Sequence, residues 1–120
     1  MTKKIEFKKL MEDVTGGKDS NYREYEGKEL YIHNIIISDK EKYEENGKYR
    51  PKLVAIHPDR NFLWIKSDKN MSIEKILEMA LIKEGEVINA QGIFSTGDWL
   101  ENHYLNLSNF EYVKKFYGRE

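Results

Sequence analysis

Residues 84–110 read EGEVINAQGIFSTGDWLENHYLNLSNF, and this stretch predicts two strands joined by a short polar loop. Gly92 lies inside the first strand, where a glycine usually marks a bend, a bulge or the close approach of another backbone. In the second strand, polar and apolar residues alternate from His103 to Leu107, as they do in a half-buried strand. This hairpin decides the fold because it completes a sheet that earlier segments begin.

Three strand-like segments and one amphipathic helix precede the hairpin. The strands are expected at residues 28–39, 49–57 and 62–67, with a charged loop over 40–48 that ends in an Asn46-Gly47 turn. The first of them is long, carries apolar residues on both faces in its second half, and should curve to serve both sides of a barrel. Strand, strand, strand, helix, strand, strand is the order of a five-stranded Greek-key barrel, the OB-fold. The chain is therefore predicted to be mainly β with one or two short helices.

Helical periodicity appears twice. Ser72 or a neighbour should cap a helix that ends near Gly85, and its apolar stripe comprises Ile73, Ile76, Leu77, Ala80 and Leu81. Residues 3–14 favour a short helix that covers one end of the barrel through Phe7, Leu10, Met11 and Val14, although Ile5 to Phe7 also fits a strand.

Length and composition are those of one folded domain. The chain has 120 residues, 39% of them hydrophobic, and a net charge of −1 although 34% of its residues are charged. We expect a core over about residues 24–112, with extensions over 1–20 and 113–120. The mixed charge excludes a wholly basic nucleic-acid binder, so a nucleic-acid site must be local. Without cysteine, a signal peptide or a membrane span, a cytoplasmic protein is expected.

Aromatic and cationic residues share one face of the third strand. Leu63 and Ile65 belong in the core, so Phe62, Trp64 and Lys66 should point outward. Bases stack on such rings while cations follow the phosphates, which is how single-strand binders work. The competing interpretation is that the rings are covered by the N-terminal segment or by a second copy of the chain.

Positive charge is concentrated over the same strands. Residues 48–69 carry six cations against two acids, whereas the preceding loop is acidic. Trp99, in the loop of the final hairpin, and Tyr49, at the start of the second strand, are further stacking candidates. The predicted nucleic-acid site therefore comprises Tyr49, Phe62, Trp64, Trp99, Lys48, Arg50, Lys52, Arg60 and Lys66.

Nothing in the sequence argues for catalysis, a cofactor or a metal. His33, His57 and His103 lack the spacing of metal ligands, and Asp98 and Glu101 have the character of solvated turn residues. Phosphate loops, dinucleotide fingerprints and nucleophile elbows are absent from the sequence. A non-enzymatic binding protein is expected.

The layout resembles the small OB-fold single-stranded-DNA-binding proteins of phages and mobile or conjugative elements of Gram-positive bacteria. Three segments carry the resemblance, which covers roughly residues 24–112: EYEGKELYIHNIIISD, KLVAIHPDRNFLWIKS and GEVINAQGIFS. It implies binding to single strands during replication, recombination or transfer, with Tyr49, Phe62, Trp64 and Trp99 at stacking positions.

The sequence leaves two alternatives open. RNA in place of DNA would use the same stacking. A protein-interaction module, such as an inhibitor or adaptor of a host enzyme, would also favour Trp, Tyr and Arg anchors. A homo-oligomer is compatible with either.

Overall fold

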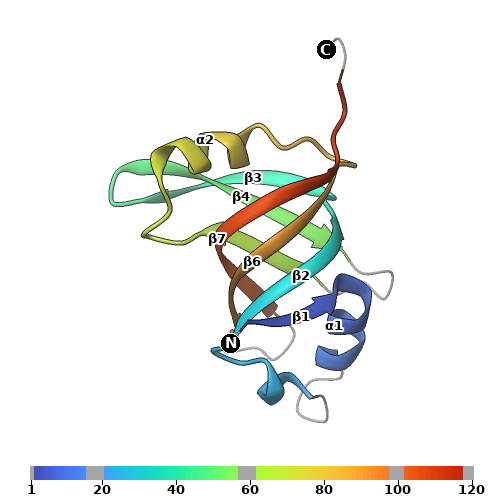
Figure 1. The fold of residues 1–120 in the computed structure, drawn as a ribbon. Helices are drawn as coiled ribbons and strands as arrows, with labels where there is room; N and C mark the ends of the chain where they lie inside the picture. The colour runs from blue at the N-terminus through green and yellow to red at the C-terminus, as the bar shows by residue number, and fades with distance from the viewer. Residues whose placement is uncertain (1, 16–20, 57–61, 98–101, 118–120) are drawn as a thin grey trace.

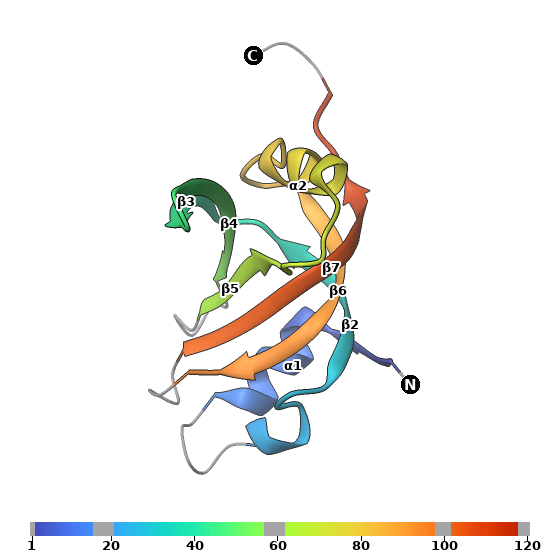
Figure 2. The same cartoon turned by 90° about the vertical axis from the view of Figure 1, so that its left-hand side faces the viewer.

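The computed structural model describes residues 2–15, 21–56, 62–97 and 102–117, and of Tyr43 and Glu45 the backbone alone. These residues form seven strands, two α-helices and one 3₁₀ turn. In chain order the elements are β1 (Lys3–Glu6), α1 (Phe7–Val14), η2 (Tyr22–Glu24), β2 (Glu29–Ile36), β3 (Asp39–Glu45), β4 (Lys48–Ile56), β5 (Phe62–Ser67), α2 (Ile73–Ala80), β6 (Val87–Thr96) and β7 (Asn102–Lys114). The strands make one curled sheet, with α1 and α2 at its opposite ends (Figures 1 and 2).

The sheet has the order β1-β2-β6-β7-β5-β4-β3. From β2 onward, the predicted strands and helix are present with one additional strand, β3, but the predicted closed five-stranded barrel is not formed. Among the described residues, β1 and β3 form the two ends of the strand order, and β1 pairs in parallel with β2. The curled sheet has an inner face, which holds the core, and an outer face (Figure 2).

The long first strand exists, but it is divided. β2 pairs with β6, and after Ile37 and Ser38 the chain continues as β3, which pairs with β4. The predicted charged loop over 40–48 is therefore wrong. A two-residue turn with Asn46 and Gly47 at φ 52° and 79° confirms the predicted turn and closes the β3–β4 hairpin. An edge strand needs few apolar residues, so the charged sequence of β3 did not indicate a strand.

A bulge explains the apolar residues on both faces of β2. The pairing register shifts between Ile32 and Ile35, where Asn34 adopts φ 60°. Ile32 and Ile35 are then both buried, while Ile36 is 56% exposed. The extra residue changes the alternation that a regular strand would keep.

Gly92 marks both a bulge and a close approach, as the sequence predicted. The register of β6 against β7 shifts between Gln91 and Gly92. A Cβ at Gly92 would lie 2.1 Å from the carbonyl oxygen of Asn106, so no other residue fits without moving the backbone. The backbone of β7 therefore lies unusually close to β6 at this position.

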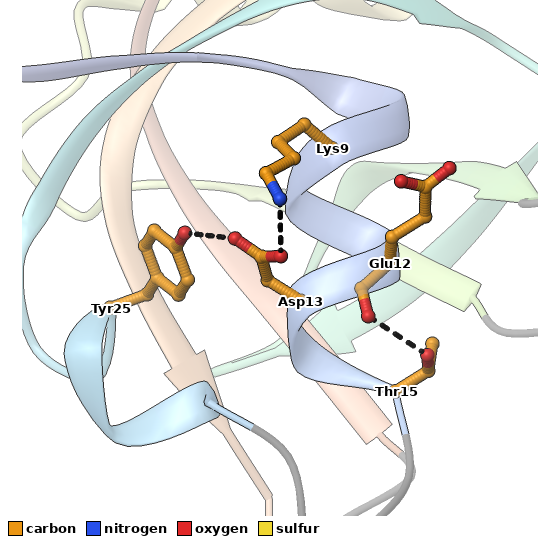
Figure 3. A network of polar contacts seen from close by, with 5 residues as sticks. All are labelled: Lys9, Glu12, Asp13, Thr15 and Tyr25. Atoms are coloured by element: carbon orange, nitrogen blue, oxygen red, sulfur yellow. Dashed lines mark hydrogen bonds and ion pairs between the residues drawn. The ribbon is translucent and has the colours of Figure 1, made fainter.

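The N-terminal segment divides into strand and helix. Lys3–Glu6 pairs with β2, and α1 follows with Phe7, Leu10, Met11 and Val14 all buried, as the helical periodicity predicted. Figure 3 shows the polar contacts that hold α1 to the segment before β2.

Asp13 is the centre of that network. The Tyr25 hydroxyl donates to its carboxylate at 2.5 Å, and Lys9 Nζ lies 3.0 Å away. The hydrogen bond from Tyr25, followed by the contact with Lys9, lowers the pKa of Asp13. Burial, followed by the carboxylate, raises the pKa of Tyr25, which stays a neutral donor. Tyr25 is 2% exposed, so the network closes one end of the core.

α2 begins at the predicted cap, and most of its apolar stripe is exposed to solvent. The Ser72 hydroxyl caps it by accepting from the Lys75 amide at 3.1 Å. The predicted apolar stripe is divided: Ile73, Leu77 and Leu81 are 76%, 60% and 72% exposed, whereas Ile76 packs against the core. Met79 and Ile82 are buried instead, because the helix rests on the end of the sheet by another, narrower side.

A buried carboxylate fixes the segment that follows α2. Glu86 is 1% exposed and accepts hydrogen bonds from the backbone amides of Lys83 at 2.6 Å and Phe116 at 2.7 Å. The Gly85 amide donates to the Ile37 carbonyl at 2.8 Å. These bonds join α2, the β2–β3 link and the C-terminal segment, so α2 is held in its orientation.

Candidate functional site

The outward face of β5 carries the residues that its alternation predicts. Leu63 and Ile65 are fully buried, while Phe62 is 36% exposed and Trp64 and Lys66 are half-buried. The prediction that these three residues point outward is confirmed.

The neighbouring strands add two residues to this face. In the register of the sheet, Lys52 of β4 lies opposite Lys66, and Tyr104 of β7 lies opposite Trp64. Residues opposite each other on neighbouring strands point to the same side of a sheet. We call the resulting group the aromatic–cationic surface: Lys52, Phe62, Trp64, Lys66 and Tyr104.

The rings and cations of this surface are in contact. Phe62 and Trp64 stack with ring centroids 5.9 Å apart and planes inclined by 28°. Lys52 Nζ lies 4.5 Å from the centroid of Trp64, and Lys66 Nζ lies 5.2 Å from the centroid of Tyr104. Cation–π attraction holds each ammonium beside a ring, so flat apolar surface and positive charge adjoin.

Lys52 also has an acidic partner. Its Nζ lies 3.3 Å from a carboxylate oxygen of Glu41 on β3. A phosphate that binds Lys52 must compete with this carboxylate, because both seek the same ammonium. Glu41 therefore limits the positive potential at this edge of the surface.

Another part of the outward face carries acidic residues in hydrogen-bonded pairs. On β2, β6 and the end of β7, Gln91 donates to Glu29 at 2.8 Å and the Tyr31 hydroxyl donates to Glu111. The bond from Thr2, followed by the bond from Gln91, lowers the pKa of Glu29. The bond from Tyr31 lowers the pKa of Glu111. Both carboxylates stay ionised at neutral pH, so a polyanion is disfavoured there and the cationic half of the face is set apart.

Three other residues of the predicted site lie elsewhere or outside the described chain. Tyr49 is 74% exposed, but alternation along β4 turns it to the side opposite Lys48, Arg50 and Lys52. The structure thus does not bring Tyr49 to the aromatic–cationic surface. Trp99 and Arg60 lie outside the described residues, as do Asp98 and Glu101.

The other two predicted cations are at the start of β4. Lys48 is exposed next to the Asn46-Gly47 turn, and an Arg50 guanidinium nitrogen donates to the Ser67 hydroxyl at 3.4 Å. Their part in binding stays a prediction.

Tyr104 is the residue that sequence reasoning missed. The alternation from His103 to Leu107 gave its outward direction, but the parallel pairing of β5 with β7 joins residues about 40 positions apart. No local pattern reveals such a neighbour.

The described histidines have packing roles. His103 is fully buried and stacks on Phe94 with centroids 5.8 Å apart, and burial lowers its pKa. His33 packs edge-on against Tyr31, and His57 lies outside the described residues. Within the described ranges, no three acidic or histidine side chains gather as metal ligands do. No described helix is both long and apolar enough to cross a bilayer.

Comparison with known proteins identifies no family: neither a family model nor a curated protein matches the chain. Solved structures do match. An aspartyl-tRNA synthetase of Leishmania major superposes with a TM-score of 0.67 and 12% identity over 95% of this chain. An asparaginyl-tRNA synthetase of Pyrococcus horikoshii gives 0.57 and 10% over 78%, and yeast Stn1 and Ten1 give 0.53 and 9% over 96%.

The matches concern parts of larger chains. This chain spans 21% of each of these two synthetase chains and 64% of the yeast chain. At such identities the likeness shows the fold alone. The chain is thus similar to OB-fold domains, mainly β with two short helices, and the aromatic–cationic surface lies outside its curled sheet.

Proposed function

We propose that this chain binds single-stranded nucleic acid, without catalysing a reaction, on the aromatic–cationic surface. The observation that carries the proposal is the contact of stacked rings with cations on one outward face: Phe62 beside Trp64, with Lys52 over the indole. OB-fold sheets bind oligonucleotides on a face of this kind. The match to two synthetases named for tRNA agrees with a nucleic-acid ligand.

Binding would proceed by stacking and charge. A base that stacks on Trp64 or Phe62 gains about 1–3 kcal/mol, and every base has a flat face, so sequence preference should be weak. Lys52 and Lys66 lie within reach of the adjoining phosphates. Lys48, Arg50, Arg60, and Trp99 as a second stacking residue, belong to the proposal as predictions from the sequence.

DNA is the proposed ligand, and a mobile element the proposed setting. This finer proposal rests on the resemblance of residues 24–112 to single-stranded-DNA-binding proteins of phages and conjugative elements. Stacking tolerates either sugar, so oligouridine and oligothymidine should be compared directly.

The test is a titration of fluorescein-labelled oligothymidine at low salt, followed by anisotropy. We expect Trp64→Ala to weaken binding at least several-fold, because it removes the larger ring of the stack. Tyr49→Ala is the matched control: an exposed aromatic residue on the same sheet, turned to its other side, whose loss should change affinity little. Circular dichroism verifies that each variant is folded.

Two results would reject the site. The first is equal loss of affinity in the Trp64 and Tyr49 variants, and the second is unchanged affinity in the Trp64 variant. Absence of binding to every single-stranded oligonucleotide at low salt would select the alternative, a protein-interaction module such as an inhibitor or adaptor of a host enzyme.

A further inference from the structure

The outer side of α2 exposes three large apolar side chains in a row. Ile73, Leu77 and Leu81 follow at intervals of four residues and are 76%, 60% and 72% exposed. Residues four apart lie one above another on a helix, so they form a continuous stripe. We call it the α2 stripe. Contiguous apolar surface of this kind usually marks an interaction site.

A groove lies beside the stripe. It runs between α2 and the β3–β4 hairpin, has a volume of about 410 Å³, and takes its apolar lining from Tyr49, Pro51 and Ala80. Ala80 is three residues from Leu77 on the helix, so the wall of the groove continues into the stripe. Lys40 Nζ donates to the Ala80 carbonyl at 3.0 Å and ties the hairpin to the end of the helix.

Positive charge surrounds this end of α2. The charged residues that line the groove are Lys40, Lys42, Arg50 and Glu41, and the Glu41 carboxylate pairs with Lys52 at 3.3 Å. On the helix, Glu78 pairs with Lys75 at 3.1 Å. Beside Leu81, Glu78 and Lys115 line a second hollow. Cations therefore predominate where the stripe meets the groove.

We propose that the α2 stripe and this groove bind an acidic amphipathic segment of a partner protein. Apolar side chains of the segment would pack on Leu77, Leu81 and Tyr49, and its carboxylates would lie over Lys40, Lys42 and Arg50. Docking of an amphipathic helix into a groove is a recurring mode of peptide recognition. None of the five residues of the aromatic–cationic surface lines the groove, although Glu41 of the groove contacts Lys52 of that surface.

Charge and size both favour this occupant over a second copy of the chain. A two-fold pairing of the groove would bring its own cations face to face, and like charges oppose association. A stable dimer also needs roughly 800 Å² from each partner, more than one stripe of three side chains provides. A short segment needs less surface and supplies the missing negative charge.

The experiment uses the full chain and two designed peptides. Each is a fluorescein-labelled helix of about 15 residues, long enough to form a helix on a surface. Leucines occupy one face of both peptides, and the remaining positions carry Glu in one and Lys in the other. Anisotropy should show binding of the Glu peptide, at least about tenfold tighter than the Lys peptide, and weakening as salt rises.

Variants locate the site. Leu77→Ala and Leu81→Ala should each weaken the Glu peptide at least about fivefold, as loss of an interface anchor does. Both keep a helix-forming residue at an exposed position, so the fold is retained. Lys42→Glu should weaken the Glu peptide and strengthen the Lys peptide. Ile36→Ala is the matched control, because Ile36 is an exposed aliphatic residue on β2.

Several outcomes would overturn the proposal. They are equal affinity for the two peptides, no binding of the Glu peptide, or no effect of the leucine variants. A dimer seen by light scattering that Leu77→Ala dissociates would assign the stripe to a second copy. Displacement of the peptide by oligothymidine would assign the groove to nucleic acid. Trp64→Ala should leave peptide affinity unchanged, so failure of the nucleic-acid proposal is a separate result.

Discussion

The dependence of oligothymidine affinity on salt should count the cations that contact phosphates. Each contact to a single strand contributes about −0.7 to the slope of log affinity against log salt concentration. The structure brings two cations, Lys52 and Lys66, to the rings of the aromatic–cationic surface. The expected slope is therefore about −1.4, and affinity should fall about sevenfold between roughly 50 and 200 mM salt. All five predicted cations would give a slope of about −3.5.

The informative perturbation is Lys66→Gln. It removes one ammonium that lies 5.2 Å from the Tyr104 ring centroid and leaves a polar side chain of similar length. The slope should move to about −0.7, so that the same change of salt lowers affinity only about 2.6-fold. Trp64→Ala should instead lower affinity at every salt concentration and keep the slope, because stacking releases no counterions.

Anisotropy titrations of labelled oligothymidine at four or more salt concentrations give these slopes. The reasoning is refuted when Lys66→Gln lowers affinity without changing the slope, or when Trp64→Ala changes the slope as much as Lys66→Gln does. Either result would mean that Lys66 and Trp64 do not have the separate roles that their positions imply.

Three further predictions concern charge and packing. Glu41→Gln frees Lys52 from its carboxylate partner at 3.3 Å, so oligothymidine should bind about two- to fivefold tighter; unchanged or weaker binding in the same titration would contradict this. Gly92→Ala would place a Cβ 2.1 Å from the Asn106 carbonyl oxygen, so urea denaturation should show a loss of about 3 kcal/mol or more; a loss below about 1 kcal/mol would show that β7 moves aside easily. The folded-state pKa of Asp13 is lowered, first by the hydrogen bond from Tyr25, so its contribution is present above the unfolded pKa of about 4 and lost as pH falls through the lower folded value. Asp13→Asn should therefore reduce the free energy of unfolding by about 1–2 kcal/mol at pH 7, and the difference from wild type should close as pH falls below about 4; an equal difference at acid pH would remove the charge from the explanation.

Local patterns in the sequence determined the elements and the direction of individual side chains. Alternation placed β5 at Phe62–Ser67 and turned Trp64 outward, and a serine hydroxyl marked the start of α2. Gly92 predicted the close approach of two strand backbones. Each of these follows from backbone geometry within a few residues, which the sequence expresses directly.

Tertiary structure decided which elements become neighbours and which faces are covered. The pairing of β5 with β7 brought Tyr104 to Trp64. The α2 stripe has the spacing of an apolar helix face, yet its three side chains are exposed, and Met79 and Ile82 are buried instead. Hydrophobic periodicity shows that a helix has an apolar side. Whether that side is covered depends on contacts with residues far away in the chain. β3 is highly charged and has a weak intrinsic propensity for β structure, yet it forms a strand because it pairs with β4.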